Sequence, residues 1–431
     1  MKSRDLKKLI LKCVLSVMML NSVPGWAQLQ KLSDYSATER PWLWWYWLGS
    51  AVDKEGIDWH LQQFKELGYG GASIAATYGV EGYESKYIPF MSPRWIEMMN
   101  YTAEQSRKSG MRIDASLTSA WPFGGPNVTS DMAAQYSVVN RLFTAMPDEN
   151  VVMDLSARQK GKLHVLSAYS TDGDYLDLTS KVGTDGILRF TFPAKKWDVY
   201  GLYSVPTGQM TKRSGLGGEG LVIDHFNKMA VEKYLERFDS LFLSSSALRA
   251  TFNDSYEVYG ADYSSVLLDE FKARRGYDLR KYLYLLDPAN KSDAARRVLC
   301  DYRETISDLL LDNFVDVWHH WAERHGVKTV EQAHGSPANW LDLYGASDIP
   351  QTESFGASPL HIKNVRIDPL YNEKSFGRPD KMLLKFASSA SHVMGKQLTS
   401  SETATWLGDH FKVALSQAKP QIDELFVSGI N

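Results

Sequence analysis

The sequence predicts an α/β protein built as a (β/α)8 TIM-like barrel, with an all-β domain inserted between the third and fourth strands. The first observation is that strand-like and helix-like stretches alternate through most of the 431 residues. The second is that eight candidate strands are separated by helices, which is the pattern of such a barrel. The third is a single interruption at residues 134–215, where short alternating runs show no helical period.

Residues 1–27 are typical of a secretory signal peptide. Basic residues precede a mostly apolar stretch, Leu9–Val23, which is too short to span a bilayer. The small residues Gly25 and Ala27 stand at the positions that signal peptidases require. We therefore expect a periplasmic or secreted bacterial protein that does not contact a membrane after cleavage. A retained anchor helix is the alternative.

Residues 28–133 are expected to supply the first three barrel strands. Pro93 at a first helical position and glycines after the helices mark where the helices begin and end. The expected elements, in chain order, are strand Trp42–Leu48, helix Asp58–Leu67, strand Tyr69–Ala75, a helix from Pro93 to about Lys108, and strand Met111–Leu117.

The insertion, residues 134–215, is expected to be β-rich. Its clearest strand candidates are Leu163–Tyr169, Ile187–Phe192 and Trp197–Val205, separated by Gly, Asp and Pro turns. The glycine-rich stretch Gly215–Gly220 that follows lacks the Lys-Ser/Thr of a phosphate-binding loop, so we interpret it as a hinge.

Residues 216–431 are expected to complete the barrel with strands four to eight. The expected helices are Phe226–Phe242, Ser264–Arg275, Asp293–His325, Lys381–Met394 and Leu407–Gln417. The expected strands are Leu248–Asn253, Val327–Gln332, Ala346–Thr352, Lys396–Ser400 and Asp423–Ile430. No helix follows the eighth strand, so we expect either a truncated product or a barrel that is closed in another way.

Composition limits the partners. A net charge of −3 argues against a nucleic-acid or membrane-surface partner. Aromatic residues make up 12% of the chain, which suits either a large core or stacking against sugar rings. Removal of the signal peptide takes away Cys13 and leaves only Cys300, so no intrachain disulfide is expected.

Candidate functional residues are those that follow the expected strands, because barrel sites are built from these loops. Two acids, Glu257 and Glu402, each come just after a strand candidate and are the candidate catalytic pair. The candidate substrate-binding residues are Trp45, Trp121, Asn253, Asp254, Gln332, His334, Glu353 and Trp406. Some have structural alternatives: Trp45 can fill the core, Asp254 can cap its own loop, and Glu257 can pair with basic residues near Arg274.

Two carboxyl groups that face each other across the mouth of a barrel are sufficient to catalyse cleavage of a glycosidic bond. One must stay protonated to protonate the leaving oxygen, and the other must stay ionised. A separation of about 5 Å predicts retention of configuration, whereas roughly 6.5–9.5 Å leaves room for a water and predicts inversion.

Several motifs together resemble glycoside hydrolase family 106, the α-L-rhamnosidase family, over most of the chain from about Pro41. They are Arg40-Pro41, Gly49–Gly56, Tyr78–Val80, Trp121–Pro126, Phe252–Glu257, Arg274–Asp278, Gln332–Gly335, Asp348–Pro350, and Ser401–Thr403 with Trp406. The resemblance implies a secreted enzyme that removes α-L-rhamnose from plant glycans by an inverting, calcium-assisted route.

Carried over to this sequence, the resemblance implies that Glu257 is the general acid and Glu402 the base that activates water. It also implies that Glu353, Gln332 and His334 contact sugar or calcium, Glu353 being the one tentative metal ligand. The strand-two exit, Gly71–Ile74, lacks an acid that the family often has, and family members are much longer. Two alternatives therefore stay open: a non-catalytic carbohydrate-binding remnant, and a barrel glycosidase of other specificity.

Overall fold

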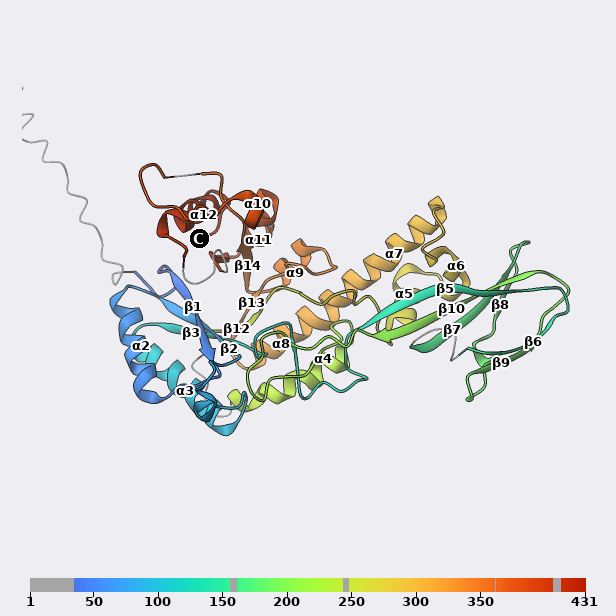
Figure 1. Cartoon of the computed structure of the whole chain (residues 1–431), viewed down its shortest axis with the longest axis horizontal. Helices are drawn as coiled ribbons and strands as arrows, with labels where there is room; N and C mark the ends of the chain where they lie inside the picture. The colour runs from blue at the N-terminus through green and yellow to red at the C-terminus, as the bar shows by residue number, and fades with distance from the viewer. Residues whose placement is uncertain (1–34, 156–160, 243–247, 361, 406–411) are drawn as a thin grey trace, which may run out of the picture.

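The computed structural model describes residues 35–155, 161–242, 248–360, 362–405 and 412–431 (Figure 1). The expected signal peptide and the candidate Trp406 lie outside the described residues. Within the described ranges, no helix is long and apolar enough to cross a membrane.

Seven parallel strands form one sheet, in the order β1-β2-β3-β12-β13-β14-β15. The strands are β1 Trp42–Leu48, β2 Gly71–Thr77, β3 Arg112–Ser116, β12 Ala250–Asn253, β13 Lys328–Glu331, β14 Ile349–Ser354 and β15 Ser400–Thr403. The first six predicted strands are confirmed, the sixth beginning at Ile349 because Ala346 still belongs to α9. The seventh prediction, Lys396–Ser400, overlaps β15 only at Ser400, because β15 lies further along the chain. The sheet is a curled parallel half-barrel.

The predicted eighth strand, Asp423–Ile430, is wrong. Its first residues belong to helix α12, Leu415–Val427, and the rest form the turn after this helix. The reason is visible in the buried positions Gln417, Gln421 and Leu425, which recur every four residues and therefore face one side of a helix. The helix predicted at Leu407–Gln417 instead begins at Leu415, and residues 407–411 lie outside the described part of the chain.

Helices alternate with the strands along the chain, and several of them cover the outer face of the sheet, as expected for parallel strands. They are α2 Lys54–Glu66, α3 Pro93–Lys108, α4 Lys228–Leu235 with the 3-10 helix Glu236–Leu241, α5 Leu267–Arg275, α6 Leu283–Leu286, α7 Asp293–Leu310, α8 Asp316–Arg324, α9 Trp340–Ala346, α10 Glu373–Phe376 and α11 Lys381–Val393. The single helix predicted at Asp293–His325 is α7 and α8 joined by the π-helical turn Leu311–Val315.

The inner, concave face of the sheet has an apolar layer. Trp44 of β1, Phe252 of β12, Val330 of β13 and Ile349 of β14 pack together with Leu398, which precedes β15. Trp44 and Leu398 come from opposite edges of the sheet, so the sheet must curl to bring them into one cluster. Side chains point to the same face at every second residue. The next inward side chain of each strand therefore comes two residues after the apolar one, closer to the carboxyl end of the strand.

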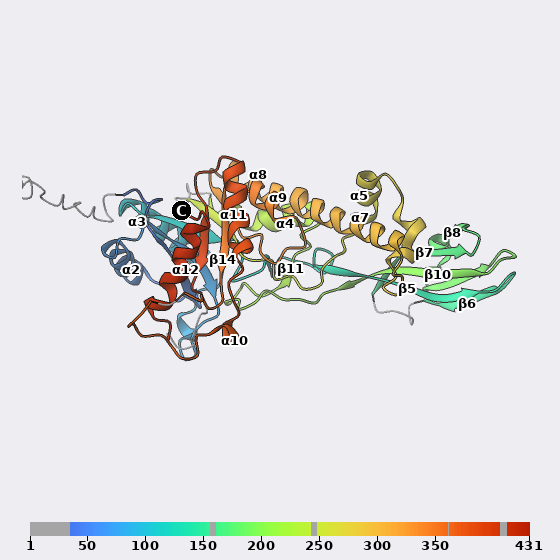
Figure 2. The same ribbon diagram turned by 90° about the horizontal axis from the view of Figure 1, so that it is seen from above.

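The β-rich insertion has its own core. Strands β5 Gln135–Ala145, β7 Lys162–Ser170, β8 Tyr175–Asp177 and β10 Trp197–Pro206 form one antiparallel sheet, and β6 Asn150–Asp154 pairs with β9 Ile187–Thr191. The short strands β4 Gly124–Gly125 and β11 Leu221–Val222 pair where the chain leaves and re-enters the α/β part. Figures 1 and 2 show the insertion at one end of an elongated molecule, with α7 running toward it.

Candidate active site

The loops at the carboxyl end of the sheet hold several residues in strained backbone conformations. Ser50 follows β1, Ala120 follows β3 and Ala404 follows β15, and their φ angles are 48°, 62° and 63°. Arg213, on the segment that returns from the insertion, has a φ of 53°. Non-glycine residues rarely adopt these angles, and such residues cluster at functional sites.

Glu402 lies on β15 at this edge and is only 7% exposed. The Gln332 side-chain amide donates a hydrogen bond of 2.8 Å to Glu402 Oε2. Burial raises the pKa of the Glu402 carboxyl, and hydrogen bonds from Gln332 and Thr405 oppose that rise. Among the acids on the inner face of the sheet, Glu402 is therefore the one whose ionised form is stabilised by hydrogen bonds from neighbouring side chains.

Two further carboxyls lie beside Glu402. Glu353 is its register partner on the neighbouring strand β14, and Asp254 follows β12. Burial, followed by the charge on Glu402, raises the pKa of Glu353 to about 7. Burial and the charges on Glu402 and Glu353 hold the pKa of Asp254 well above its ordinary value. Asp254, Glu353 and Glu402 are called the carboxyl cluster below.

Tyr46 of β1 joins this cluster from the opposite edge of the sheet. Burial raises the pKa of its phenol, and the charges on Glu402, Asp254 and Glu353 raise it further, whereas Arg213 lowers it. Tyr46 follows Trp44 by two residues, and the two rings stack with centroids 5.9 Å apart. The inward stripe of β1 is therefore Trp44 and Tyr46, and it ends at the carboxyl cluster.

A chain of side-chain amides fixes the floor of the site. The Gln332 amide nitrogen donates to Gln351 Oε1 at 2.9 Å as well as to Glu402, and the Gln351 amide donates to Ser400 Oγ at 3.0 Å. Gln332 is fully buried, and its side-chain oxygen has no hydrogen-bond partner among the described residues. The predicted site residue Gln332 thus orients the predicted base, Glu402.

Glu257 occupies a different position from the carboxyl cluster. Its Oε2 is ion-paired with Lys212, from the segment that returns from the insertion, and also accepts from the Tyr259 hydroxyl at 3.2 Å. Its side chain is 36% exposed. The charge of Glu257 does not contribute to the raised pKa values of Asp254, Glu353 and Tyr46. The basic partner of Glu257 is therefore Lys212, and not a residue near Arg274 as the sequence suggested.

The structure corrects the expected orientation of Trp45 and Asn253. Trp45 is 8% exposed and packs edge-on against Phe64 of α2 and Trp47, so it belongs to the outer core instead of the site. Asn253 is 2% exposed, and its amide donates to Glu331 Oε2 at 3.0 Å. Asn253 therefore supports the loop that follows it and does not face a ligand.

Trp121 and His334 lie on loops at the carboxyl end of the sheet. The Arg213 guanidinium lies over the Trp121 ring, 5.8 Å from its centroid. The His334 ring packs against Trp340 and edge-on against the exposed Phe355, with centroids 5.1 and 5.2 Å away. Burial lowers the pKa of His334, so a neutral imidazole is expected there at neutral pH.

The expected calcium finds no ready site. Across the ranges that the structure describes, no group of three or more His, Cys, Asp or Glu side chains is arranged to hold a metal ion. The carboxyl cluster has the oxygen chemistry that calcium prefers, but its members do not form a coordination shell. No step of the mechanism is therefore derived through calcium.

Comparison with known proteins identifies the family. A family model described as alpha-L-rhamnosidase, glycoside hydrolase family 106, matches residues 34–146 and 150–431. The chain belongs to this family. It is 24% identical over 416 residues to a protein of Formosa agariphila named "Putative beta-glucuronidase", covering 85% of this chain and 34% of that protein.

A solved structure shares the fold. The rhamnosidase from Novosphingobium sp. PP1Y matches with a TM-score of 0.70 and 17% identity, over 93% of this chain and 55% of that chain. The chain therefore spans about a third of the length of the first relative and about half of the second. The family resemblance inferred from the sequence motifs is confirmed.

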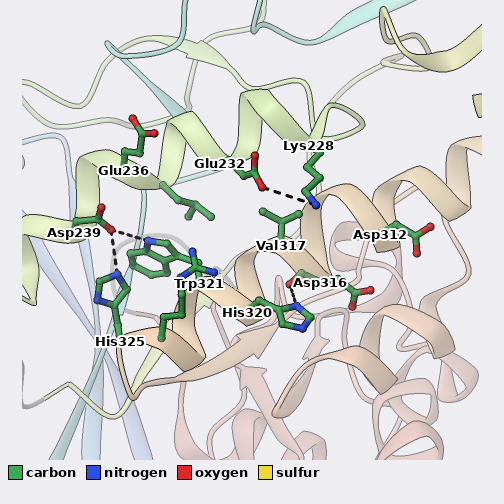
Figure 3. A pocket seen from close by; sticks show the side chains of 12 residues that line it. Lys228, Glu232, Glu236, Asp239, Asp312, Asp316, Val317, His320, Trp321 and His325 are labelled. Atoms are coloured by element: carbon green, nitrogen blue, oxygen red, sulfur yellow. Dashed lines mark hydrogen bonds and ion pairs between the residues drawn. The ribbon is translucent and has the colours of Figure 1, made fainter. Parts of the chain in front are cut away.

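An acid-rich groove lies elsewhere, on the helical side of the molecule (Figure 3). It has a volume of about 900 Å³ and lies between α4 with its 3-10 continuation and α8. None of the predicted site residues lines it. Asp239 accepts hydrogen bonds there from Trp321 at 2.8 Å and from His325, the residue at the end of α8, at 3.1 Å.

Sequence reasoning missed Tyr46 and Glu331. Tyr46 could have been found from the two-residue period of β1, counted from Trp44 instead of Trp45. Glu331 ends β13, immediately before the predicted residue Gln332, and is fully buried. A charged residue at the end of a short apolar strand was the available signal for Glu331.

Proposed function

We propose that this chain carries the catalytic part of a glycoside hydrolase that cleaves terminal α-L-rhamnosyl linkages in plant-type polysaccharides. One observation carries the proposal: at the strand exits Asp254, Glu353 and Glu402 are buried together, and burial, followed by the charge on Glu402, raises the pKa values of Asp254 and Glu353. Glycosidic cleavage needs a protonated and an ionised carboxyl side by side, and such mutual repulsion supplies both. Family membership supports the rhamnosyl specificity.

In the proposed reaction Glu402 is the ionised base. Hydrogen bonds from Gln332 and Thr405 favour its charged form, so it can take a proton from a water molecule. The water oxygen then forms a bond to the anomeric carbon as the glycosidic C–O bond breaks. The leaving oxygen receives a proton from a carboxylic acid, and attack of the water on the face of the sugar opposite the leaving group gives inversion.

The identity of the proton donor is the point where structure and resemblance differ. The resemblance assigns this role to Glu257, whereas the structure pairs Glu257 with Lys212 outside the carboxyl cluster. Glu353, with a pKa of about 7, is protonated over the acid side of neutrality. We propose Glu353 as the donor, with Asp254 as the neighbour that keeps the proton in the cluster.

Leaving-group chemistry tests these roles. A dinitrophenyl α-L-rhamnoside departs without protonation, whereas an alkyl rhamnoside does not. Glu353→Gln should lose about 10²–10⁴-fold in kcat on the alkyl substrate and much less on the activated one, because only the first needs the acid. Glu257→Gln is the matched variant. If Glu257→Gln shows this split and Glu353→Gln does not, Glu257 is the donor.

A second specificity is favoured by two observations. One relative is named a "Putative beta-glucuronidase", and the charge of Arg213 acts on Tyr46 beside the carboxyl cluster, where this guanidinium can bind a sugar carboxylate. Turnover of aryl β-glucuronides with no turnover of aryl α-L-rhamnosides would establish this alternative. Calorimetric binding of either sugar without hydrolysis would instead establish a non-catalytic carbohydrate-binding protein.

Two expectations stay as proposals. We propose export to the periplasm or beyond, motivated by the signal-like residues 1–27 and checked by N-terminal sequencing of the mature protein. Calcium assistance, implied by the family, is checked by comparing activity before and after a chelator. Unchanged activity and unchanged thermal stability after chelation would show that the protein does not need calcium.

A further inference from the structure

Glu331 is a buried acid that the proposed reaction does not use. It ends β13 and is 0% exposed. In the sheet it stands directly beside Asn253, the last residue of β12, which leads into the acid-bearing segment Asn253–Glu257. Glu331 therefore lies where this segment leaves the sheet.

Both oxygens of Glu331 bind the acid-bearing segment. Oε2 accepts from the Asn253 amide at 3.0 Å, and Oε1 accepts from the Tyr256 hydroxyl at 2.8 Å. Tyr256 is held a second time, because its backbone N–H donates to the carbonyl oxygen of His334 at 2.7 Å. The two anchored residues flank Asp254 and immediately precede Glu257 in the chain.

The surroundings favour a neutral carboxyl. Three groups neighbour Glu331: Asn253 and Tyr256 on the segment, and Tyr344 on α9, all neutral at physiological pH. A charged carboxylate that is fully buried among neutral groups is costly. Burial raises the pKa of Glu331 to about 8, in agreement with this argument.

We propose that the neutral carboxyl of Glu331 is a positioning group, which holds Asn253 and Tyr256 so that Asp254, between them, keeps its place in the carboxyl cluster. In the structure both partners donate to Glu331, and when the Tyr256 hydroxyl turns, a neutral carboxyl can donate its proton to the Tyr256 oxygen while it accepts from the Asn253 amide. Glu331 then acts through these two residues and does not touch the substrate. The kinetic part of the inference rests on the proposed hydrolase function.

Two substitutions of similar size separate this role from simple filling of space. The side-chain amide of Glu331→Gln can donate to Tyr256 and accept from Asn253, so it reproduces the neutral acid. Glu331→Met fills the same volume but leaves both partners without a hydrogen bond. Tyr256→Phe removes only one of the two contacts and reports on the same network if Glu331→Met fails to fold.

Backbone hydrogen exchange of residues 253–257 tests the inference without any assay of activity. We expect Glu331→Gln to match the wild type, and Glu331→Met and Tyr256→Phe to exchange at least tenfold faster in this segment, with unchanged exchange in α2 and α3. Equal exchange in all four proteins would overturn the proposal. Fast exchange in Glu331→Gln would overturn the neutral form, because an amide cannot replace an ionised carboxylate there.

Kinetics on an aryl α-L-rhamnoside then tests the positioning role. We expect kcat to fall at least tenfold in Glu331→Met with KM within about twofold, and to recover in Glu331→Gln, because misaligned catalytic groups mainly reduce the chemical step. Wild-type kcat in Glu331→Met would overturn the role. An inactive wild type would instead refute the proposed function, and the exchange measurement would still decide whether Glu331 holds the segment.

Discussion

Two acid-rich regions of this molecule differ in burial, in the partners of their carboxyls and in what those carboxyls can do. The carboxyl cluster lies at the strand exits, and Glu402 within it is only 7% exposed. The groove between α4 and α8 contains Glu232, Glu236, Asp239, Asp312 and Asp316 (Figure 3), and the Asp239 side chain is 50% exposed.

Several of the groove acids are paired with basic or polar neighbours. Glu232 lies 3.9 Å from Lys228, and Asp312 lies 2.7 Å from Arg274. Water and these partners screen their charges, so such acids contribute little beyond solubility and local packing. In the cluster, burial and like charge act together, and they push protons onto Asp254 and Glu353. A large groove lined by acids is therefore a poorer guide to chemistry than a few acids that cannot all ionise.

The largest expected difference between the regions comes from matched Glu→Gln substitutions. Glu402→Gln should reduce kcat about 10³-fold, because it removes the base that activates water. Glu232→Gln in the groove changes the same atoms and should leave kcat and KM within about twofold. Initial rates on an aryl α-L-rhamnoside make the comparison. Comparable losses of kcat in the two variants would mean that the carboxyl cluster and the groove do not differ in function.

A second test uses the pH dependence of stability. The pKa of Glu353 is raised to about 7 in the folded protein, so folding favours its protonated form. The stability from this group is full below its ordinary pKa and is lost as pH rises through about 7. Glu353→Gln should therefore gain stability relative to the wild type between about pH 4.5 and 7, on the order of 1–2 kcal/mol.

Thermal unfolding of both proteins across this pH range measures the gain. The exposed groove residue Glu236 provides the control, since Glu236→Gln should track the wild type at every pH. A constant difference between Glu353→Gln and the wild type would show that Glu353 does not hold a proton in the native state.

Much of the framework could be predicted from the sequence, because strands and helices leave local periods. The orientation of β1 could not. Its sequence, WLWWYWL, places large aromatic residues on both faces, so the two-residue period exists but its phase is ambiguous. Packing against α2 decides it, which turns Trp45 outward and Tyr46 toward the carboxyl cluster.

The partners of the candidate catalytic residues could not be predicted from the sequence, because they come from distant parts of the chain. The hydrogen bond between Asn253 and Glu331 spans 78 residues, and the ion pair between Lys212 and Glu257 spans 45. No local pattern reports such pairs. The motif Phe252–Glu257 was found, but which of its two acids lies in the buried cluster followed only from the packing.

Two adjacent residues of β1 test the phase of the strand. Tyr46→Phe should reduce kcat/KM about tenfold with a small change in melting temperature, because it removes one polar group beside the carboxyl cluster. Trp45→Leu should destabilise the fold by roughly 2–4 kcal/mol and leave kcat of the folded protein unchanged, because it leaves a cavity under α2. The reversed outcome would mean that Trp45 faces the site.

The smallest effect is expected in the groove. Asp239→Ala removes the acceptor of the Trp321 and His325 hydrogen bonds, which lie at the end of α8. Because the Asp239 side chain is half exposed, water replaces much of the lost interaction, and we expect a loss of about 1 kcal/mol in stability. Denaturant unfolding measures this loss, and rates on the aryl rhamnoside should stay within about twofold. A tenfold loss of kcat with the fold intact would make the groove part of the functional site and would overturn the contrast between the two regions.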